Sequence, residues 1–263
     1  MLCPSTYRIS RHRSGFKNFI PTEMMQTNQK NYKFLVPIAG VFGALLIISN
    51  VLSSKIVSVG GLTFPGGALL FPLSYIFGDI LTEIYGYSNA RRVIWAGFAG
   101  AFLWAISYWV VAALPVAPFW NHQAEFEQIL GIGPRLAFAG MFAYLVGEFL
   151  NSFIVARMKV YLEGRYLAVR LILSTMVGQA LDTSIVLALA FSGIFTAQQL
   201  VEMGLSLWTL KVLWEVIALP LTLPAIGWLK RVEEEDFFDT STNFNPFALG
   251  AKERHHNHEV LNS

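Results

Sequence analysis

The stretch FPLSYIFGDILTEIYG, residues 71–86, combines two features that rarely occur together. Most of its side chains are as apolar as those of a membrane-spanning helix, yet Asp79 and Glu83 lie within it one helical turn apart. A charged side chain at the centre of a bilayer costs roughly 2.5–3.5 kcal/mol, whereas a Leu or Phe returns about 0.3–0.6 kcal/mol. The stretch therefore predicts a membrane helix whose carboxyl groups face a protein interior or a wet cavity rather than lipid.

The composition of the whole chain favours the same class of protein. Of its 263 residues, 54% are hydrophobic and only 14% are charged, which is more apolar than a soluble domain of this length. The net charge of +2 gives no support to a nucleic-acid-binding surface. Cys3 is the single cysteine and the sequence has no P-loop motif, which excludes thiolate metal sites and P-loop nucleotide hydrolysis. We expect an all-α integral membrane protein that binds no metal and no cofactor.

Six apolar segments are long enough to cross a hydrocarbon core of about 30 Å as helices. They cover residues 35–52, 66–81, 93–114, 136–155, 171–195 and 200–228. Lysine and arginine are concentrated in the N-terminal arm, in the second and fourth loops and directly after the last segment, whereas the opposite loops hold only Lys55 and Arg135. Because cytoplasmic loops carry the excess of basic residues, both termini are predicted to be cytoplasmic.

The polarity of the remaining segments predicts three regions. Residues 1–30 have no apolar core and are expected to form a disordered basic arm, with Met24 or Met25 left open as the true start. Residues 31–231 form the six-helix transmembrane domain, and residues 232–263 are expected to be a solvated C-terminal tail.

Three of the spans repeat one local pattern, in GDILTE (residues 78–83), GEFLNS (residues 147–152) and GQALDT (residues 178–183). In each, a glycine precedes an acid or amide, and a second polar residue follows three positions later on the same helix face. The glycine lets a neighbouring helix or a ligand approach that face closely. The pairs that share a face are Asp79 with Thr82, Glu148 with Asn151, and Gln179 with Asp182.

Other polar residues extend this pattern. Lys211 and Glu215 lie one turn apart in the last span, Asn50 lies near the outer end of the first, and Tyr75 precedes Asp79 by one turn. Mutual pairing cannot account for all of them, because one lysine does not neutralise five carboxylates, although a surface position is an alternative for Glu83.

Glycines and prolines interrupt the start of the second span. They are Gly60, Gly61, Pro65, Gly66, Gly67 and Pro72. A short, interrupted span of this kind indicates a transporter binding site, and an ordinary turn before a helix is the alternative.

The predicted polar groups suit a flat, nitrogen-rich ligand. Carboxylates accept paired N–H donors, amides both donate and accept, and aromatic faces stack on planar rings. A heterocycle with a guanine-like edge fits this set, while an inorganic cation, an amino acid or a polyamine would also use buried carboxylates.

Four blocks of the sequence resemble the queuosine precursor transporter family, which is also grouped as a vitamin uptake transporter family. The blocks are FPLSYIFGDILTEIYGYSNARR, AYLVGEFLNSFIVARMK, STMVGQALDTSIVLALAF and LKVLWEVIALPL, in the family's order and spacing. The resemblance implies a multi-pass protein of the bacterial cytoplasmic (inner) membrane. It would import 7-deazaguanines such as 7-cyano-7-deazaguanine for tRNA modification, with a fold similar to the substrate-capture subunits of energy-coupling-factor transporters.

The family's polar motif positions carry over to named residues of this sequence. They fall on Asp79, Thr82, Glu83, Glu148, Asn151, Gln179, Asp182 and Lys211. Of these we retain all but Glu83 and add two residues from the analysis above. The predicted substrate-binding residues are Asn50, Tyr75, Asp79, Thr82, Glu148, Asn151, Gln179, Asp182 and Lys211.

A secondary transporter is the leading hypothesis, with the bilayer and a deazapurine as its partners and no nucleic acid. One alternative is the substrate-capture subunit of an ATP-driven vitamin or nucleobase importer. Another is an intramembrane enzyme, but Ile76 occupies the place of the first Gly of the aspartyl intramembrane protease motif, and no catalytic residue is predicted. The preferred precursor, the coupling ion and a homo-oligomeric state are left open.

Overall fold

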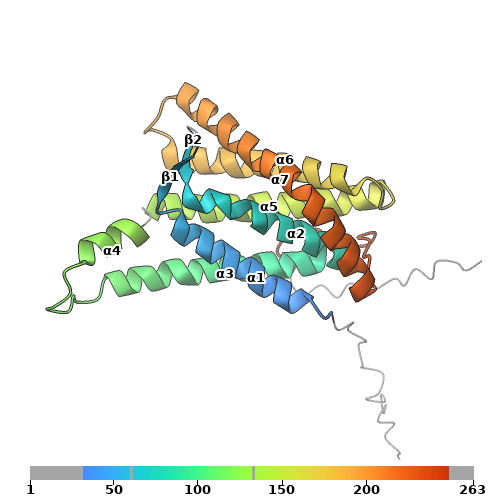
Figure 1. Ribbon diagram of the computed structural model, residues 1–263, viewed down its shortest axis with the longest axis horizontal. Coiled ribbons are helices and arrows are strands. Elements are labelled where there is room, and N and C mark those ends of the chain that lie inside the picture. The colour runs from blue at the N-terminus through green and yellow to red at the C-terminus, as the bar shows by residue number, and fades with distance from the viewer. Residues whose placement is uncertain (1–31, 60–61, 132–133, 249–263) are drawn as a thin grey trace, which may run out of the picture. The chain divides into compact units, whose positions relative to one another are not determined.

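The computed structural model describes residues 32–59, 62–131 and 134–248 (Figure 1). The predictions of a disordered arm and of a start at Met24 or Met25 therefore lie outside the described residues. The same holds for Gly60 and Gly61 and for the end of the predicted tail, residues 249–263.

The described part of the chain is mainly helical, and each of the six predicted apolar segments overlaps a helix. The helices are α1 (Leu35–Leu52), α2 (Phe71–Tyr85), α3 (Tyr87–Ala112), α4 (Gln123–Leu130), α5 (Pro134–Tyr161), α6 (Leu167–Val186) and α7 (Ala197–Glu233). A π-helical turn, Leu187–Phe191, continues α6. Between α1 and α2, the strands β1 (Ile56–Val59) and β2 (Leu62–Pro65) pair antiparallel, with Ile56 opposite Pro65, and a 3₁₀ turn, Gly66–Leu69, follows. The sequence analysis predicted neither this hairpin nor the short helix α4.

Five of the helices are long and apolar enough to cross a membrane. They are α1, α3, α5, α6 with its π-helical turn, and α7. Helix α2 has 15 residues and rises about 22 Å, which is less than a hydrocarbon core of about 30 Å. It is thus the short element that the glycines and prolines predict.

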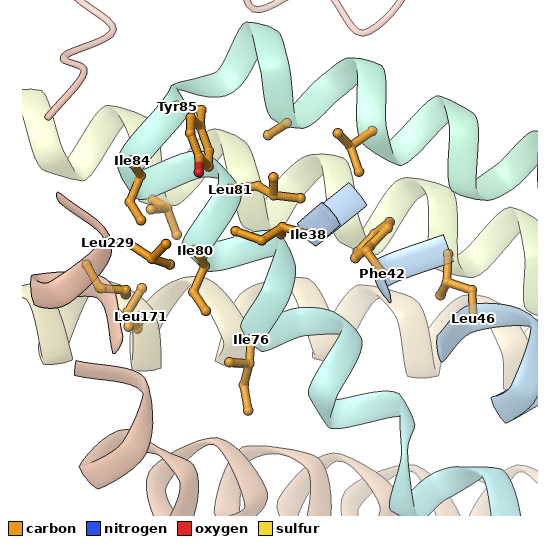
Figure 2. Close-up of a cluster of buried hydrophobic side chains, with 14 of the residues drawn as sticks. Ile38, Phe42, Leu46, Ile76, Ile80, Leu81, Ile84, Tyr85, Leu171 and Leu229 are labelled. Carbon is orange, nitrogen blue, oxygen red and sulfur yellow. The ribbon is translucent and has the colours of Figure 1, made fainter. Parts of the chain in front are cut away.

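Helix α2 is enclosed by other helices. It contacts α1, α3, α5 and α7, and from Ser74 to Tyr85 every residue except half-buried Phe77 is buried. Figure 2 shows one of its apolar contacts, where Phe42 and Leu46 of α1 lie in the same buried cluster as Leu81. A helix that is buried all round does not meet lipid, which explains how its acids are tolerated.

The first and last helices meet at one end of the bundle (Figure 1). The Glu233 carboxylate, at the end of α7, accepts hydrogen bonds from the backbone N–H groups of Lys33 at 3.1 Å and Phe34 at 2.6 Å, directly before α1. Helix α1 has no capping side chain of its own. Glu233 therefore satisfies backbone donors that the start of a helix leaves unpaired.

Residues 234–248, which we call the strap, pack against the start of α3 instead of forming the predicted solvated tail. The Asp239 carboxylate accepts a hydrogen bond from the Tyr87 backbone N–H at 3.1 Å, and Asp239 is 1% exposed. The Arg91 guanidinium donates to the Asn243 carbonyl at 2.6 Å. The strap supplies partners that α3 lacks, because α3 begins directly after Gly86 without a capping side chain.

Candidate functional site

Two groups of polar residues lie at different positions along α2. The first, which we call the Glu83 network, comprises the buried Glu83, Lys159 and Arg170 together with the partly buried Lys230 and the exposed Asp236. The Arg170 guanidinium binds both Glu83 oxygens, at 2.5 and 3.1 Å, and the Lys230 ammonium lies 2.6 Å from the same carboxylate. The Lys159 ammonium lies 3.5 Å away. The network joins the ends of α2, α5, α6 and α7.

The alternative of a surface position for Glu83 is wrong, because its side chain is fully buried. Lys159 and Arg170, which the charge count treated as loop residues, lie inside α5 and α6 and are also buried. Asp236 of the strap pairs with Lys159 and Lys230. Burial tends to raise the pKa of Asp236, but these two ammonium groups outweigh it and hold the pKa below its ordinary value.

The second group lies deeper along the helices, and we call it the polar cluster. Its members come from α2, α5, α6 and α7, and they are Tyr75, Asp79, Glu148, Asn151, Gln179, Asp182, Lys211 and Glu215. Figure 1 shows these four helices side by side. Helix α2 contacts α5 and α7, and α6 contacts the same two helices.

The α2 and α5 blocks bind each other directly. The Asn151 amide donates to Asp79 Oδ1 at 2.6 Å, and the Thr82 and Ser152 hydroxyls are hydrogen bonded at 3.0 Å. Thr82 is also bonded to the Gly78 carbonyl. The sequence pattern therefore placed these residues on the correct faces, since all of the side chains point between α2 and α5.

The glycine that opens each block allows this close approach, as predicted. A Cβ atom at Gly78 would overlap the Glu148 carboxylate. At Gly147 it would lie 2.9 Å from the Asp182 Cβ, and at Gly178 it would lie 3.0 Å from the Asn151 Cβ. Any side chain at these positions would push the helices apart.

Lys211 of α7 forms an ion pair with Asp182 of α6. This ion pair leaves the other four of the five acids without Lys211 as a partner. The remaining acids lie close enough to interact with each other: Asp79 with Glu148 and Glu215, and Glu148 with Asp182 and Glu215. Tyr75 interacts with Gln179, Asp182 and Glu148. The polar groups of four helices thus converge on one buried place.

Several buried polar atoms of the cluster have no hydrogen-bond partner among the described residues. Most of them are oxygen atoms of acids and amides, namely Asp79 Oδ2, Glu148 Oε1 and Oε2, Asn151 Oδ1, Gln179 Oε1 and Glu215 Oε1. Leaving such an atom unpaired costs about 1–3 kcal/mol, and more for a charged group. The cluster is therefore rich in acceptors, and a ligand that carries N–H donors would satisfy them.

Two predicted site residues have other partners. The Asn50 amide donates to the Leu46 carbonyl of its own helix at 2.8 Å, and no described contact joins it to the cluster. Thr82 lies at the edge of the cluster, and its hydroxyl is already bonded to α2 and α5.

The sequence analysis left some of the polar groups near the cluster off its list. Tyr144 is buried with an unpartnered hydroxyl and precedes Glu148 by one turn, just as Tyr75 precedes Asp79. Thr175 stands in the same relation to Gln179. This shared spacing is the signal that could have found them.

The fold and the cluster define a class of protein before any comparison is made. A bundle of apolar helices that encloses acids, amides and an ion pair is a multi-pass membrane protein with an internal polar site. Comparison with known proteins identifies the family within this class. The chain belongs to the family described as "Putative vitamin uptake transporter", whose model matches residues 65–225, a range that includes the whole polar cluster.

Two curated relatives carry more specific names. The chain is 30% identical over 190 residues to the "Queuosine precursor transporter" of Escherichia coli (strain K12), which covers 70% of this chain and 82% of that protein. It is 28% identical over 186 residues to the "Probable queuosine precursor transporter" of Bacillus subtilis (strain 168), covering 70% of this chain and 80% of that protein. Both are named as transporters and not as enzymes, in agreement with the prediction. No solved structure matches the chain, so the expected likeness to energy-coupling-factor subunits stays a prediction.

Proposed function

We propose that this protein imports 7-deazaguanine precursors of queuosine, such as 7-cyano-7-deazaguanine, across the bacterial cytoplasmic membrane for tRNA modification. The names of its relatives support transport of a queuosine precursor. The observation that carries the substrate class is the acceptor-rich cluster, in which six buried oxygen atoms have no donor among the described residues. A deazaguanine offers adjacent ring and amino N–H groups on one edge, and its flat ring suits an aromatic neighbour.

Seven of the eight cluster residues have a role in this proposal. Asp79 Oδ2 and the Glu148 carboxylate accept the paired N–H donors, because both are buried and unpartnered. The amide oxygens of Asn151 and Gln179 accept further donors, and the Tyr75 ring stacks on the ligand. The ion pair of Lys211 with Asp182 holds α6 and α7 together at the site.

We further propose that α2 is the sixth crossing of a 31–231 transport domain. The contact of Glu233 with the start of α1 supports an even number of crossings, because it brings the first and last helices to the same end. That end holds Arg91, Lys159, Arg170 and Lys230. An excess of basic residues favours the cytoplasmic side, so both ends of the domain face the cytoplasm.

The two ends of the bundle are built from different elements. The Glu83 network and the strap tie α2, α3, α5, α6 and α7 at the cytoplasmic end. At the other end, the hairpin and the 3₁₀ turn lead into α2. In our proposal the precursor enters at the hairpin end, binds in the polar cluster and leaves when the cytoplasmic end opens.

The test uses bacteria that cannot synthesise the precursor and lack their own importer. These cells receive 7-cyano-7-deazaguanine, and queuosine is measured in their tRNA. Expression of this protein should restore queuosine, and Asp79→Asn should lower the initial rate by about tenfold or more because a charged acceptor is lost. Glu202→Gln, at an exposed position of α7, is the matched control and should restore queuosine fully.

Unchanged queuosine with well-expressed wild-type protein would contradict the proposed function. Restoration only when ATPase and coupling subunits are co-expressed would contradict secondary transport and support the capture-subunit alternative.

A further inference from the structure

Glu148 is the acid of the polar cluster with both carboxylate oxygens unpartnered among the described residues, whereas Asp79 and Glu215 each have one such oxygen. Asp79 accepts a hydrogen bond from Asn151, Asp182 is paired with Lys211, and Glu83 is paired with three cations. Glu148 is fully buried, and neither of its carboxylate oxygens has a hydrogen-bond partner among the described residues.

The surroundings of Glu148 add negative groups rather than positive ones. The titratable or charged groups near it are Tyr75 and Asp79 on α2, Tyr144 on α5 itself, Asp182 on α6, and Glu215 and Lys211 on α7. Lys211 is the one cation in this set, and it is already paired with Asp182. No cation therefore remains to balance an ionised Glu148.

The space around the Glu148 carboxylate is provided by Gly78. A Cβ atom at Gly78 would overlap Glu148 Oε1, so the carboxyl group lies directly against the α2 backbone. The absence of a side chain at Gly78 thus leaves the room that this carboxyl group occupies between α2 and α5.

An ionised carboxylate without a partner costs several kcal/mol in such surroundings, even after the protein relaxes. A neutral carboxylic acid avoids this cost. We infer that Glu148 holds a proton while the site is empty and releases it when a ligand rich in N–H donors binds. This inference rests on the proposed function, because the N–H groups of the precursor are what replace the proton.

The exchange is balanced without any other reactant. The O–H bond of the Glu148 acid breaks, the proton passes to solvent, and the carboxylate then accepts hydrogen bonds from ligand N–H groups, which stay on the ligand. Asp182 and Lys211, whose side chains are 9% and 22% exposed, are the most exposed members of the polar cluster. The empty carrier can then change conformation without an unpaired buried charge.

The test counts protons during binding. Purified protein in weakly buffered detergent solution is titrated with 7-cyano-7-deazaguanine, and a pH indicator measures the protons released per ligand bound. At pH values at which Glu148 of the ligand-free protein is protonated, wild type should release about one proton per ligand bound. Over that pH range, its affinity should rise by up to about tenfold per pH unit.

Two variants assign the proton to its residue. Glu148→Gln keeps the shape of the side chain but has no carboxyl proton, so it should bind more weakly, release none and lose the pH dependence. Glu202→Gln, the exposed control on α7, should behave as wild type. If Glu148→Gln binds too weakly for protons to be counted, the pH dependence of the wild-type affinity tests the inference by itself.

The outcomes separate this inference from the proposed function. Wild-type binding that releases no proton, with an affinity that is flat between about pH 6 and about pH 9, overturns the inference and leaves the transport proposal standing. Release of one proton by Glu148→Gln assigns the exchange to another acid and also overturns it. Absence of precursor binding by folded wild type contradicts the proposed function itself.

Discussion

Glu83 shows why single residues can be found in a sequence while their partners cannot. Its presence in an apolar helix was plain from residues 71–86, but the cations that neutralise it are 76 to 147 positions away along the chain. Only the folded helices bring Lys159, Arg170 and Lys230 to one carboxylate. A surface position was the natural alternative because the local sequence contains no partner.

Replacement of Glu83 should therefore be severe. In Glu83→Gln, the buried Arg170 and Lys159 lose their shared counter-charge, and we expect the free energy of unfolding to fall by about 3–5 kcal/mol. Thermal or denaturant unfolding in detergent measures this change in the free energy of unfolding, with Glu202→Gln as the exposed control. A loss below about 1 kcal/mol would contradict a central role for the network.

The members of the polar cluster were more predictable than the Glu83 network. Asp79, Glu148 and Asp182 were found because buried acids are costly in apolar spans, and that argument needs no knowledge of partners. Which acid is paired and which is not depends on packing, and the sequence carries no signal for it. Asn50 was included on polarity alone, although its amide can bond to its own helix.

Helix α2 shows what patterning predicts and what it misses at element boundaries. The apolar segment was placed at residues 66–81, whereas α2 runs from Phe71 to Tyr85 after a 3₁₀ turn. The difference at the end of α2 arises because the apolar segment was ended before Glu83, for which a surface position was an alternative. Asp79 and Glu83 continue the helix because they are satisfied by α5, α6 and α7.

The close contact of α5 with α6 makes two glycines of α5 a matched pair. Gly147→Ala places a Cβ atom 2.9 Å from the Asp182 Cβ, and overpacking of this kind should destabilise the protein by about 1–3 kcal/mol. Gly140→Ala meets nothing within 4 Å and should stabilise the protein by up to about 1 kcal/mol, because alanine favours the helix over glycine. Unfolding in detergent compares them, and equal effects would argue against the packing role of Gly147.

The strap was predicted to be solvated because its start, EEDFFD (residues 234–239), is strongly acidic. The structure instead uses these acids as partners: Asp236 for the Glu83 network and Asp239 for the start of α3. The sequence analysis missed this because the buried donors that they satisfy, Lys159 and the Tyr87 N–H, are remote in sequence.

The lowered pKa of Asp236 gives the strap a pH dependence. A carboxyl group with a depressed folded pKa stabilises fully above its unfolded value of about 3.9, and this contribution is lost as pH falls through the folded pKa. We expect the strap to stay docked from about pH 7 to about pH 5 and to loosen below about pH 4. A fluorophore is attached to Ser241→Cys in a Cys3→Ser background, and the fluorescence anisotropy of this label measures how mobile the strap is.

Asp236→Asn provides the control, because it removes the titrating group. Its label should already be more mobile at neutral pH and should respond less to acid. An identical acid response in both proteins would assign the loosening to another group.

The proposed membrane topology of the whole chain depends on the contact between the start of α1 and the end of α7. With six crossings, a reporter that is active only in the cytoplasm should work when fused after residue 263 or inserted at Gly164, between α5 and α6. The same reporter at Phe119, between α3 and α4, should be inactive. Activity at Phe119 together with inactivity at the C-terminus would reverse the proposed orientation, and activity at both would contradict the number of crossings.

The account as a whole requires that four helices contribute to one binding site. The most direct measurement is the affinity of purified protein for 7-cyano-7-deazaguanine in four variants, one per helix: Asp79→Asn, Asn151→Ala, Gln179→Ala and Lys211→Met. We predict that wild type binds and that each variant binds about tenfold more weakly or worse while remaining folded. Wild-type affinity in folded variants of two or more helices would contradict a single shared site.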